Sequence, residues 1–232
     1  MTPAAEILAA RIRSSGPILF SEFMETALYH PEHGSYRCPR DPFGKDGGCF
    51  TASQLQPVFG RLVAASVRAH HSRLGSPSLF TVAEWGAGRA ELAPFFTEFR
   101  YIPIDAAVTE FPAPFTGVVF CNELFDALPV DVASLRGDEF LLMRVDHRAG
   151  SFVWQPAEPV DDAWRAYLEP LASNFEDRSQ ITIELPVRLQ PTLARMAASL
   201  HRGAIIAIDY GYAQREIVRF SQGTLMSYRR HQ

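Results

Sequence analysis

Four short apolar runs, each five or six residues long, limit the possible fold of this chain more than any other feature. They are 79–84 (LFTVAE), 101–105 (YIPID), 117–121 (GVVFC) and 204–209 (AIIAID). Near-continuous apolar runs of this length are typical of strands that are buried on both faces of a parallel sheet. Segments of helical composition separate them, as the crossovers of such a sheet require. The sequence therefore predicts an α/β fold.

Helices are predicted before and between these strands. Residues 4–14 and 55–74 carry apolar side chains at helical spacing, and Ser21 fits the N-cap of a further helix. The helix before the last strand would open at Pro191 and close at Gly203.

One segment departs from the α/β pattern. The turn-forming residues His147–Gly150 lie between two apolar runs, FLLMRVD and SFVWQP. This pattern predicts a β-hairpin inserted into the α/β fold. We therefore expect a helical N-terminal cap over 1–76 and an α/β core over 77–232, with the insertion at about 135–185.

Charge and hydropathy argue against several classes of protein. The net charge of −4 gives no electrostatic reason for broad nucleic-acid binding. No run approaches 18 consecutive apolar residues, so no membrane span is predicted. The stretch MTPAAEILAARIR lacks the pattern of a signal peptide, and we expect a cytoplasmic location.

The cysteine and histidine residues do not predict a disulfide framework or a metal site. Three cysteines make an odd count, and no Cys-x-x-Cys pair occurs. His30, His33, Cys38 and Cys49 are close in sequence, but their spacing matches no common zinc pattern. We therefore expect no metal.

A glycine-rich turn follows the first strand, in the sequence EWGAGRA from Glu84 to Ala90. Glycines between a strand and a helix let a ligand approach the backbone closely, although Gly-Ala-Gly also forms ordinary turns. In the dinucleotide register Glu91 would face a pyrophosphate, which disfavours NAD. The register acid-x-Gly-x-Gly-x-Ala instead resembles motif I of class I S-adenosylmethionine-dependent methyltransferases. Asp105, at the end of the second strand, stands where Rossmann-like folds hold ribose hydroxyls, or it caps a helix.

Polar residues also follow the third strand, in the sequence NELFDALPV. Asn122, Glu123 and Asp126 would lie at the carboxyl end of a strand beside the reversal point of the sheet, where ligands bind. The two acids would share a face if residues 123–126 formed a helical turn. Capping of a helix start by these residues is the alternative interpretation.

NELFDALPV resembles the signature of the MidA family, long filed as a domain of unknown function. Its mitochondrial members are complex I assembly factors that act as protein arginine methyltransferases. Other blocks agree in the family's order: Phe23-Met24, Ala27-Leu28-Tyr29, Phe50-Thr51, Val58-Phe59-Gly60, Arg202-Gly203, Ile208-Asp209-Tyr210-Gly211 and Gly223-Thr224-Leu225. The resemblance implies a Rossmann-like class I methyltransferase sheet with a helical N-terminal cap, an S-adenosyl-L-methionine cofactor and a protein substrate.

The resemblance also implies roles for single residues. Glu123 and Asp126 would clamp the guanidinium of an acceptor arginine, and Asn122 would contact cofactor or acceptor. Asp209 and Tyr210 would lie on the same rim, with strand-end packing as an alternative for Tyr210, and Phe59-Gly60 would close over the pocket. The residues implied in cofactor binding are Glu84, Gly86, Ala87, Gly88, Asp105, Thr51 and Asn122.

The chain also departs from the family pattern. Cys49 stands where the family usually has Asp, and Ser53-Gln54 stands where Pro-Glu is common. Family members continue for roughly another hundred residues, a domain-sized extension, past the position of Gln232. We therefore expect a sheet without its last strands. The alternative function is that of a non-catalytic, partner-binding assembly factor.

Overall fold

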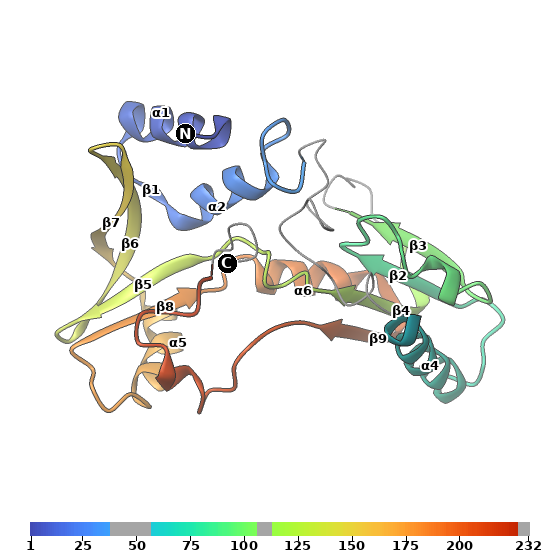
Figure 1. The fold of residues 1–232 in the computed structure, drawn as a ribbon. Helices are drawn as coiled ribbons and strands as arrows, with labels where there is room; N and C mark the ends of the chain where they lie inside the picture. The colour runs from blue at the N-terminus through green and yellow to red at the C-terminus, as the bar shows by residue number, and fades with distance from the viewer. Residues whose placement is uncertain (38–56, 106–112, 227–232) are drawn as a thin grey trace. The chain divides into compact units, whose positions relative to one another are not determined.

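The computed structural model describes residues 1–37, 57–105 and 113–226 (Figure 1). Contacts between residues divide the chain into two compact units. The first unit comprises Met1–Gly48, Leu128–Arg188 and Gly211–Gln232. The second comprises Cys49–Ala127 and Leu189–Tyr210. Each unit is described below by itself.

The second unit is built on a four-stranded parallel sheet, and this confirms the predicted α/β class. Its strands are β2 (Thr81–Trp85), β3 (Arg100–Ile104), β4 (Phe115–Asn122) and β9 (Leu200–Ile208). They lie in the order β3-β2-β4-β9. The chain therefore reverses its direction of travel across the sheet between β2 and β4, as the third apolar run predicted.

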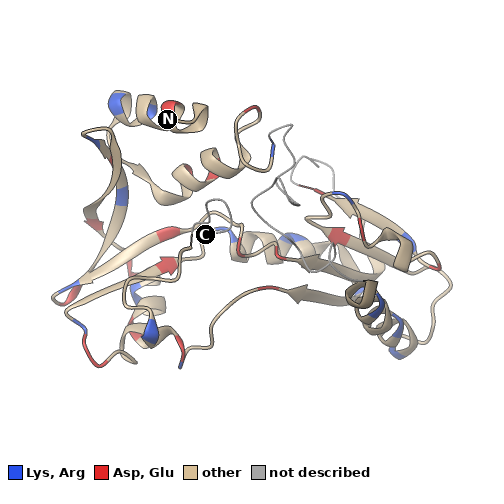
Figure 2. Cartoon of the chain, viewed as in Figure 1, with Lys and Arg blue, Asp and Glu red and all other residues tan. Residues whose placement is uncertain are grey.

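The sheet is covered on both faces because its strands are apolar on both faces. Val82, Val118 and Phe120 pack with α4 (Pro57–Arg73) on one side. Ala83, Val119 and Cys121 pack with α6 (Leu189–Ala198) on the other. The predicted helix over 55–74 is confirmed over 57–73, while 55–56 lie outside the described residues. Helix α4 carries three exposed arginines, Arg61, Arg68 and Arg73, and its basic positions are blue in Figure 2.

The prediction that Gly203 ends the preceding helix is wrong. Helix α6 ends at Ala198, and Gly203 lies inside β9, opposite Gly117 of β4. A Cβ atom at Gly203 would lie 1.9 Å from the carbonyl oxygen of Gly117, and one at Gly117 would lie 1.9 Å from that of Thr81. These glycines therefore allow neighbouring strands to approach one another, and the helix ends without one.

The glycine turn leads into turns and a 3₁₀ helix instead of the expected α-helix. Among residues 86–99 the structure has one short helix, η1 (Ala93–Phe95). Ala90 has a φ of 53°, in the left-handed region, and Pro94 follows within the next turn. Both features oppose a regular α-helix, because left-handed backbone and an interior proline break its hydrogen-bond pattern.

The first unit contains a five-stranded antiparallel sheet. The strands β1 (Ile18–Leu19), β6 (Glu139–Arg148), β5 (Asp131–Arg136) and β8 (Gln180–Leu185) lie in that order, and β7 (Ser151–Pro159) pairs with β6. The hairpin predicted around His147–Gly150 is confirmed as β6 and β7. Its place in a larger sheet was not predicted, because antiparallel partners such as β5 and β8 are far apart in the sequence.

Among its described residues, the first unit has three α-helices and a 3₁₀ helix. They are α1 (Pro3–Ser15), α2 (Phe20–Tyr29), α5 (Asp162–Ala172) and η2 (Ile217–Arg219). The N-cap of α2 is Leu19, so the assignment of Ser21 as the cap is wrong. The backbone N–H of Ser21 instead donates to Asp131 Oδ1 at 3.0 Å, and this bond ties α2 to β5. None of the described helices is long and apolar enough to cross a membrane.

The contacts group the chain differently from the predicted cap and core. Helix α4, which falls within the predicted cap of 1–76, packs on the parallel sheet. Residues 128–188 instead share a unit with α1 and α2. The predicted division into a cap and a core stays a prediction about the protein's domains.

Candidate functional site

The carboxyl ends of the four parallel strands bring most of the predicted site residues to one edge of the sheet. Trp85 of β2 is in register with Ile104 of β3 and with Cys121 of β4, and Asn122 is in register with Ile208 of β9. The segments that follow these positions are Gly86–Gly88, Asp105, Glu123–Asp126 and Asp209. Segments far apart in the sequence are therefore neighbours in the second unit.

The glycine turn folds over the end of β3. The backbone N–H groups of Gly86 and Ala87 donate to the carbonyl oxygen of Ile104 at 2.7 and 3.2 Å, so the turn lies beside Asp105, which is exposed. Gly86 and Gly88 have φ values of 73° and 51°. A Cβ atom at Gly88 would meet nothing within 4 Å. The backbone of the turn is therefore accessible to a ligand at Gly88, and a carboxylate lies next to it. This arrangement suits a ligand with hydroxyl and charged groups.

Glu84, the acid before the turn, is buried against Tyr101. Glu84 is only 6% exposed, and its Oε2 accepts a hydrogen bond from the Tyr101 hydroxyl at 2.5 Å. Burial, offset in part by this hydrogen bond, raises the pKa of Glu84 to about 7. The pKa of Tyr101 is raised as well, by burial and by the neighbouring carboxylate. Sequence reasoning missed Tyr101, which lies near the start of the neighbouring strand β3, and only its long side chain on that strand could have indicated it.

Replacing Glu84 by glutamine is expected to stabilise the protein relative to wild type at pH 8 but not at pH 4. The folded-state pKa is raised from 4.5 to about 7, so the carboxyl's stabilising contribution is present below about 4.5 and lost as the pH rises through about 7. At pH 8 the difference in the free energy of unfolding should be about 3 kcal/mol. Urea unfolding at both pH values measures it. If the difference in the free energy of unfolding between variant and wild type did not change with pH, the raised pKa of Glu84 would be contradicted.

The predicted acidic residues form a turn after β4. The helical turn considered for 123–126 does not form, because Glu123 has a φ of 50°. Leu124 and Phe125 are partly buried and pack against the core between β4 and α6. The Asn122 side-chain amide donates to Glu123 Oε1 at 3.4 Å. Burial first, then the charges of Asp209 and Glu123, raise the pKa of Asp126 to about 6.

Asp209 contributes to the same turn from the end of β9. Its Oδ2 accepts hydrogen bonds from the backbone N–H groups of Leu124 and Phe125 at 3.0 and 2.6 Å. Its Oδ1 accepts from the N–H of Tyr210 at 2.9 Å. The Tyr210 residue is 74% exposed, which excludes the alternative that it packs at a buried strand end.

Other predicted residues have different positions. Thr51 lies outside the described residues. Phe59 and Gly60 lie in α4, where Phe59 packs on the sheet and a Cβ at Gly60 would meet the ring of Phe95 at 2.3 Å. Both have packing roles that need no ligand. Among the described residues, no group of three or more His, Cys, Asp or Glu side chains could hold a metal ion.

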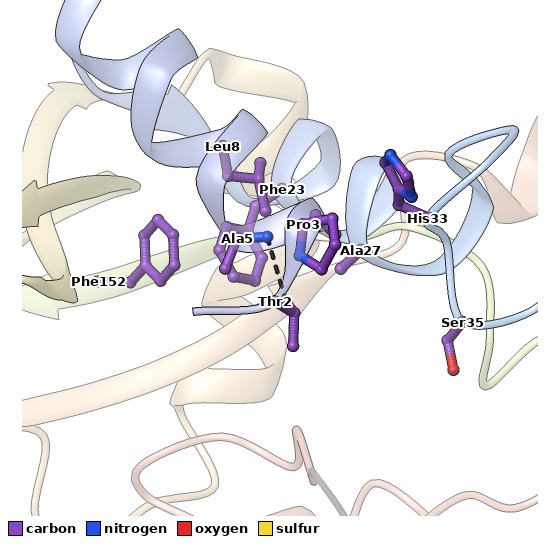
Figure 3. Close-up of a pocket in the computed structure, with 10 residues that line it drawn as sticks. Thr2, Pro3, Ala5, Leu8, Phe23, Ala27, His33, Ser35 and Phe152 are labelled. Carbon is purple, nitrogen blue, oxygen red and sulfur yellow. Dashed lines mark hydrogen bonds between the residues drawn. The ribbon is translucent and has the colours of Figure 1, made fainter. Parts of the chain in front are cut away.

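A pocket of about 420 Å³ lies in the first unit (Figure 3). Its lining is largely apolar, with Leu8 and Phe23 from two helices and Phe152 from β7. The hydroxyl of Thr2 on its rim accepts from the N–H of Ala5 and caps α1. None of the described residues that were predicted to hold cofactor or acceptor lines this pocket.

The chain is similar in sequence to proteins that are named as methyltransferases. The chain is 39% identical over 89 residues to "Protein arginine methyltransferase NDUFAF7 homolog, mitochondrial" of Drosophila melanogaster, which is 38% of this chain and 20% of that protein. It is 32% identical over 92 residues to the human protein arginine methyltransferase NDUFAF7, which is 40% of this chain and 21% of that protein. The aligned part thus spans about a fifth of the length of these relatives.

Solved structures resemble the whole chain. A Burkholderia thailandensis protein, described as a "likely methyl transferase" and crystallised with S-adenosyl-homocysteine, matches with a TM-score of 0.85 and 27% identity. That match covers 99% of this chain and 68% of the other. A family model described as "Putative S-adenosyl-L-methionine-dependent methyltransferase" matches residues 97–232, more than half of the chain. The chain therefore belongs to this family of S-adenosyl-L-methionine-dependent methyltransferases, as its resemblance to the MidA family implied.

Proposed function

We propose that this chain binds S-adenosyl-L-methionine at the glycine turn and transfers its methyl group to a protein side chain, in particular to arginine. One observation carries the proposal: the turns Gly86–Gly88 and Glu123–Asp126 follow the neighbouring parallel strands β2 and β4 at the same edge of the sheet. A cofactor and an acceptor that must react in line need two adjacent sites of this kind.

The residues of the glycine turn fit the cofactor. Open space beside Gly88 lets the cofactor approach the backbone, and the exposed carboxylate of Asp105 can accept hydrogen bonds from ribose hydroxyls. Glu84 has a pKa of about 7, and the positive charge of a bound cofactor would stabilise its ionised form. When bound, the cofactor supplies a methyl group on a positively charged sulfur.

The turn Glu123–Asp126, called the acidic turn below, fits a cationic acceptor. Two carboxylates can bind a guanidinium group through paired, charge-assisted hydrogen bonds. Asp126 has a pKa of about 6, so it is mostly ionised at pH 7, and an arginine would favour that state further. The names of the relatives, protein arginine methyltransferases, support the same acceptor.

Calorimetric titration with S-adenosyl-L-methionine and S-adenosyl-homocysteine tests the first half of the proposal. We expect a single site for both, with dissociation constants of roughly 1 μM to 1 mM, the usual range of KM values. Absence of heat at several temperatures would contradict cofactor binding at this site.

Transfer is tested with isotopically labelled S-adenosyl-L-methionine and a protein extract from cells that lack the gene. Label recovered as methylarginine after hydrolysis is the expected result. Cofactor binding without any transfer would favour the alternative function, a non-catalytic protein that binds a partner during assembly. A cytoplasmic location and the absence of nucleic-acid partners remain parts of the proposal, and the net charge of −4 supports the second.

A further inference from the structure

The side chain of Asp209 joins the end of one strand to the acidic turn after its neighbour. One oxygen, Oδ2, accepts two consecutive backbone N–H groups, those of Leu124 and Phe125. These residues lie 85 and 84 positions away in the sequence. Hydrogen bonds that a carboxylate accepts are roughly twice as strong as neutral ones. The contact is therefore a specific tertiary anchor for the turn.

The acidic turn needs such an anchor. Glu123 adopts a φ of 50°, a conformation that is unfavourable for a residue with a side chain. Its N–H donates to the carbonyl oxygen of Ile208 at 2.9 Å, so the strand pairing of β4 and β9 continues directly into the bonds to Asp209. Without the carboxylate, two partly buried N–H groups would lose their acceptor, and other conformations of the turn would become accessible.

We propose that Asp209 is a positioning residue that fixes Glu123 and Asp126 in the geometry needed to receive the methyl acceptor. This inference rests on the proposed function, because it assigns a role within that site. Asp209 does not need to touch the acceptor itself, since its carboxylate is engaged by the backbone of the turn and by the N–H of Tyr210.

The charge of Asp209 has a second effect on the same turn. The groups that affect Asp126 are Asp209 and Glu123, which both favour the protonated form, and backbone N–H groups at Ala127 and Asp126 itself, which oppose it. Burial is the largest cause of the raised pKa of Asp126, about 6, and the charge of Asp209 follows it. Removing that charge should therefore lower the pKa of Asp126.

Two substitutions separate the hydrogen bonds from the charge. Asp209→Asn keeps an oxygen that can accept from the turn but removes the charge, whereas Asp209→Ala removes both. We expect Asp209→Ala to lower kcat/KM for the protein acceptor by about 100-fold, because misplaced binding groups cost catalysis of this order. Asp209→Asn should lower it less. The affinity for S-adenosyl-homocysteine should change much less than kcat/KM in both variants, because Asp209 bonds to the turn after β4 and not to the glycine turn.

Two further measurements report on the turn directly. Amide hydrogen exchange at Leu124 and Phe125 should be at least about tenfold faster in Asp209→Ala, because the acceptor of both N–H groups is lost. The acid limb of the kcat/KM profile should move to lower pH in both variants, since Asp126 loses a neighbouring negative charge. A residue with a merely structural role would not move this limb.

Asp131→Ala is the matched control. Asp131 is a buried aspartate that accepts a backbone N–H, from Ser21 in the first unit, and it belongs to neither proposed site. The Asp131→Ala variant should have a lower free energy of unfolding, with kcat/KM and the pH profile of kcat/KM unchanged. Unchanged exchange at Leu124 and Phe125 in Asp209→Ala would overturn the proposal. If wild type transfers no methyl group, the proposed function fails, while the exchange measurement still decides whether Asp209 holds the turn.

Discussion

Replacing Gly86 by valine is expected to weaken binding of S-adenosyl-L-methionine by at least about 100-fold, which calorimetric titration measures directly. Gly86 has a φ of 73°, a conformation that costs a residue with a side chain about 1–2 kcal/mol and a β-branched one more. Its Cβ would also lie 3.0 Å from Cδ1 of Leu124 in the acidic turn. The variant therefore disturbs both the bond from Gly86 to Ile104 and the packing of the neighbouring turn.

Gly137→Val is the matched control for this experiment. Gly137 lies in the turn between β5 and β6 with a φ of 63°, and a Cβ there would meet nothing within 4 Å. It imposes a similar backbone strain in the other unit, so it should lower stability and leave the cofactor affinity unchanged. Equal affinities for wild type and Gly86→Val would remove the glycine turn from the cofactor site.

Removing the charges of the acidic turn is expected to reduce methyl transfer by about 100-fold or more for the double variant Glu123→Gln and Asp126→Asn. Both substitutions keep the size of the side chain, and the acceptor's positive charge would then be left without its partners. We expect the loss in kcat/KM for the acceptor, with little change in the dissociation constant of S-adenosyl-homocysteine. Single-turnover assays with saturating cofactor separate acceptor binding from the chemical step.

Glu139→Gln controls for the general loss of a carboxylate. Glu139 is exposed at the start of β6 in the antiparallel sheet, and the variant should transfer methyl groups at the wild-type rate. If the double variant also retained wild-type transfer, Glu123 and Asp126 would have no part in the reaction. The helix-capping interpretation of these acids would not be restored, because no helical turn forms at 123–126.

The parallel sheet and the edge that carries the site could be predicted because their signals are local. A strand buried on both faces needs a near-continuous apolar run, and β2 and β4 are such runs. The polar residues directly after them must lie at the carboxyl edge, whatever the remaining fold. The glycine turn and the acidic turn were therefore recognisable from sequence order alone.

The antiparallel sheet was predicted only as its central hairpin. The strands β6 and β7 are joined by a short turn, which the residues His147–Gly150 indicate. The partners β5 and β8 are separated from each other by more than forty residues, and local pattern contains no information about that pairing. Gly203 was misread for a similar reason, because its role depends on Gly117 in another strand.

By itself, the sequence determined the α/β class, the four parallel strands and the two turns on which the proposed function rests. These follow from hydrophobic pattern and residue order, which act over a few neighbouring residues. Only the tertiary structure decided that Glu84 is paired with Tyr101 and that Asp209 holds the turn of Glu123 and Asp126. Such contacts join strands distant in sequence, and their hydrogen bonds and raised pKa values arise only once folding has removed water from between them.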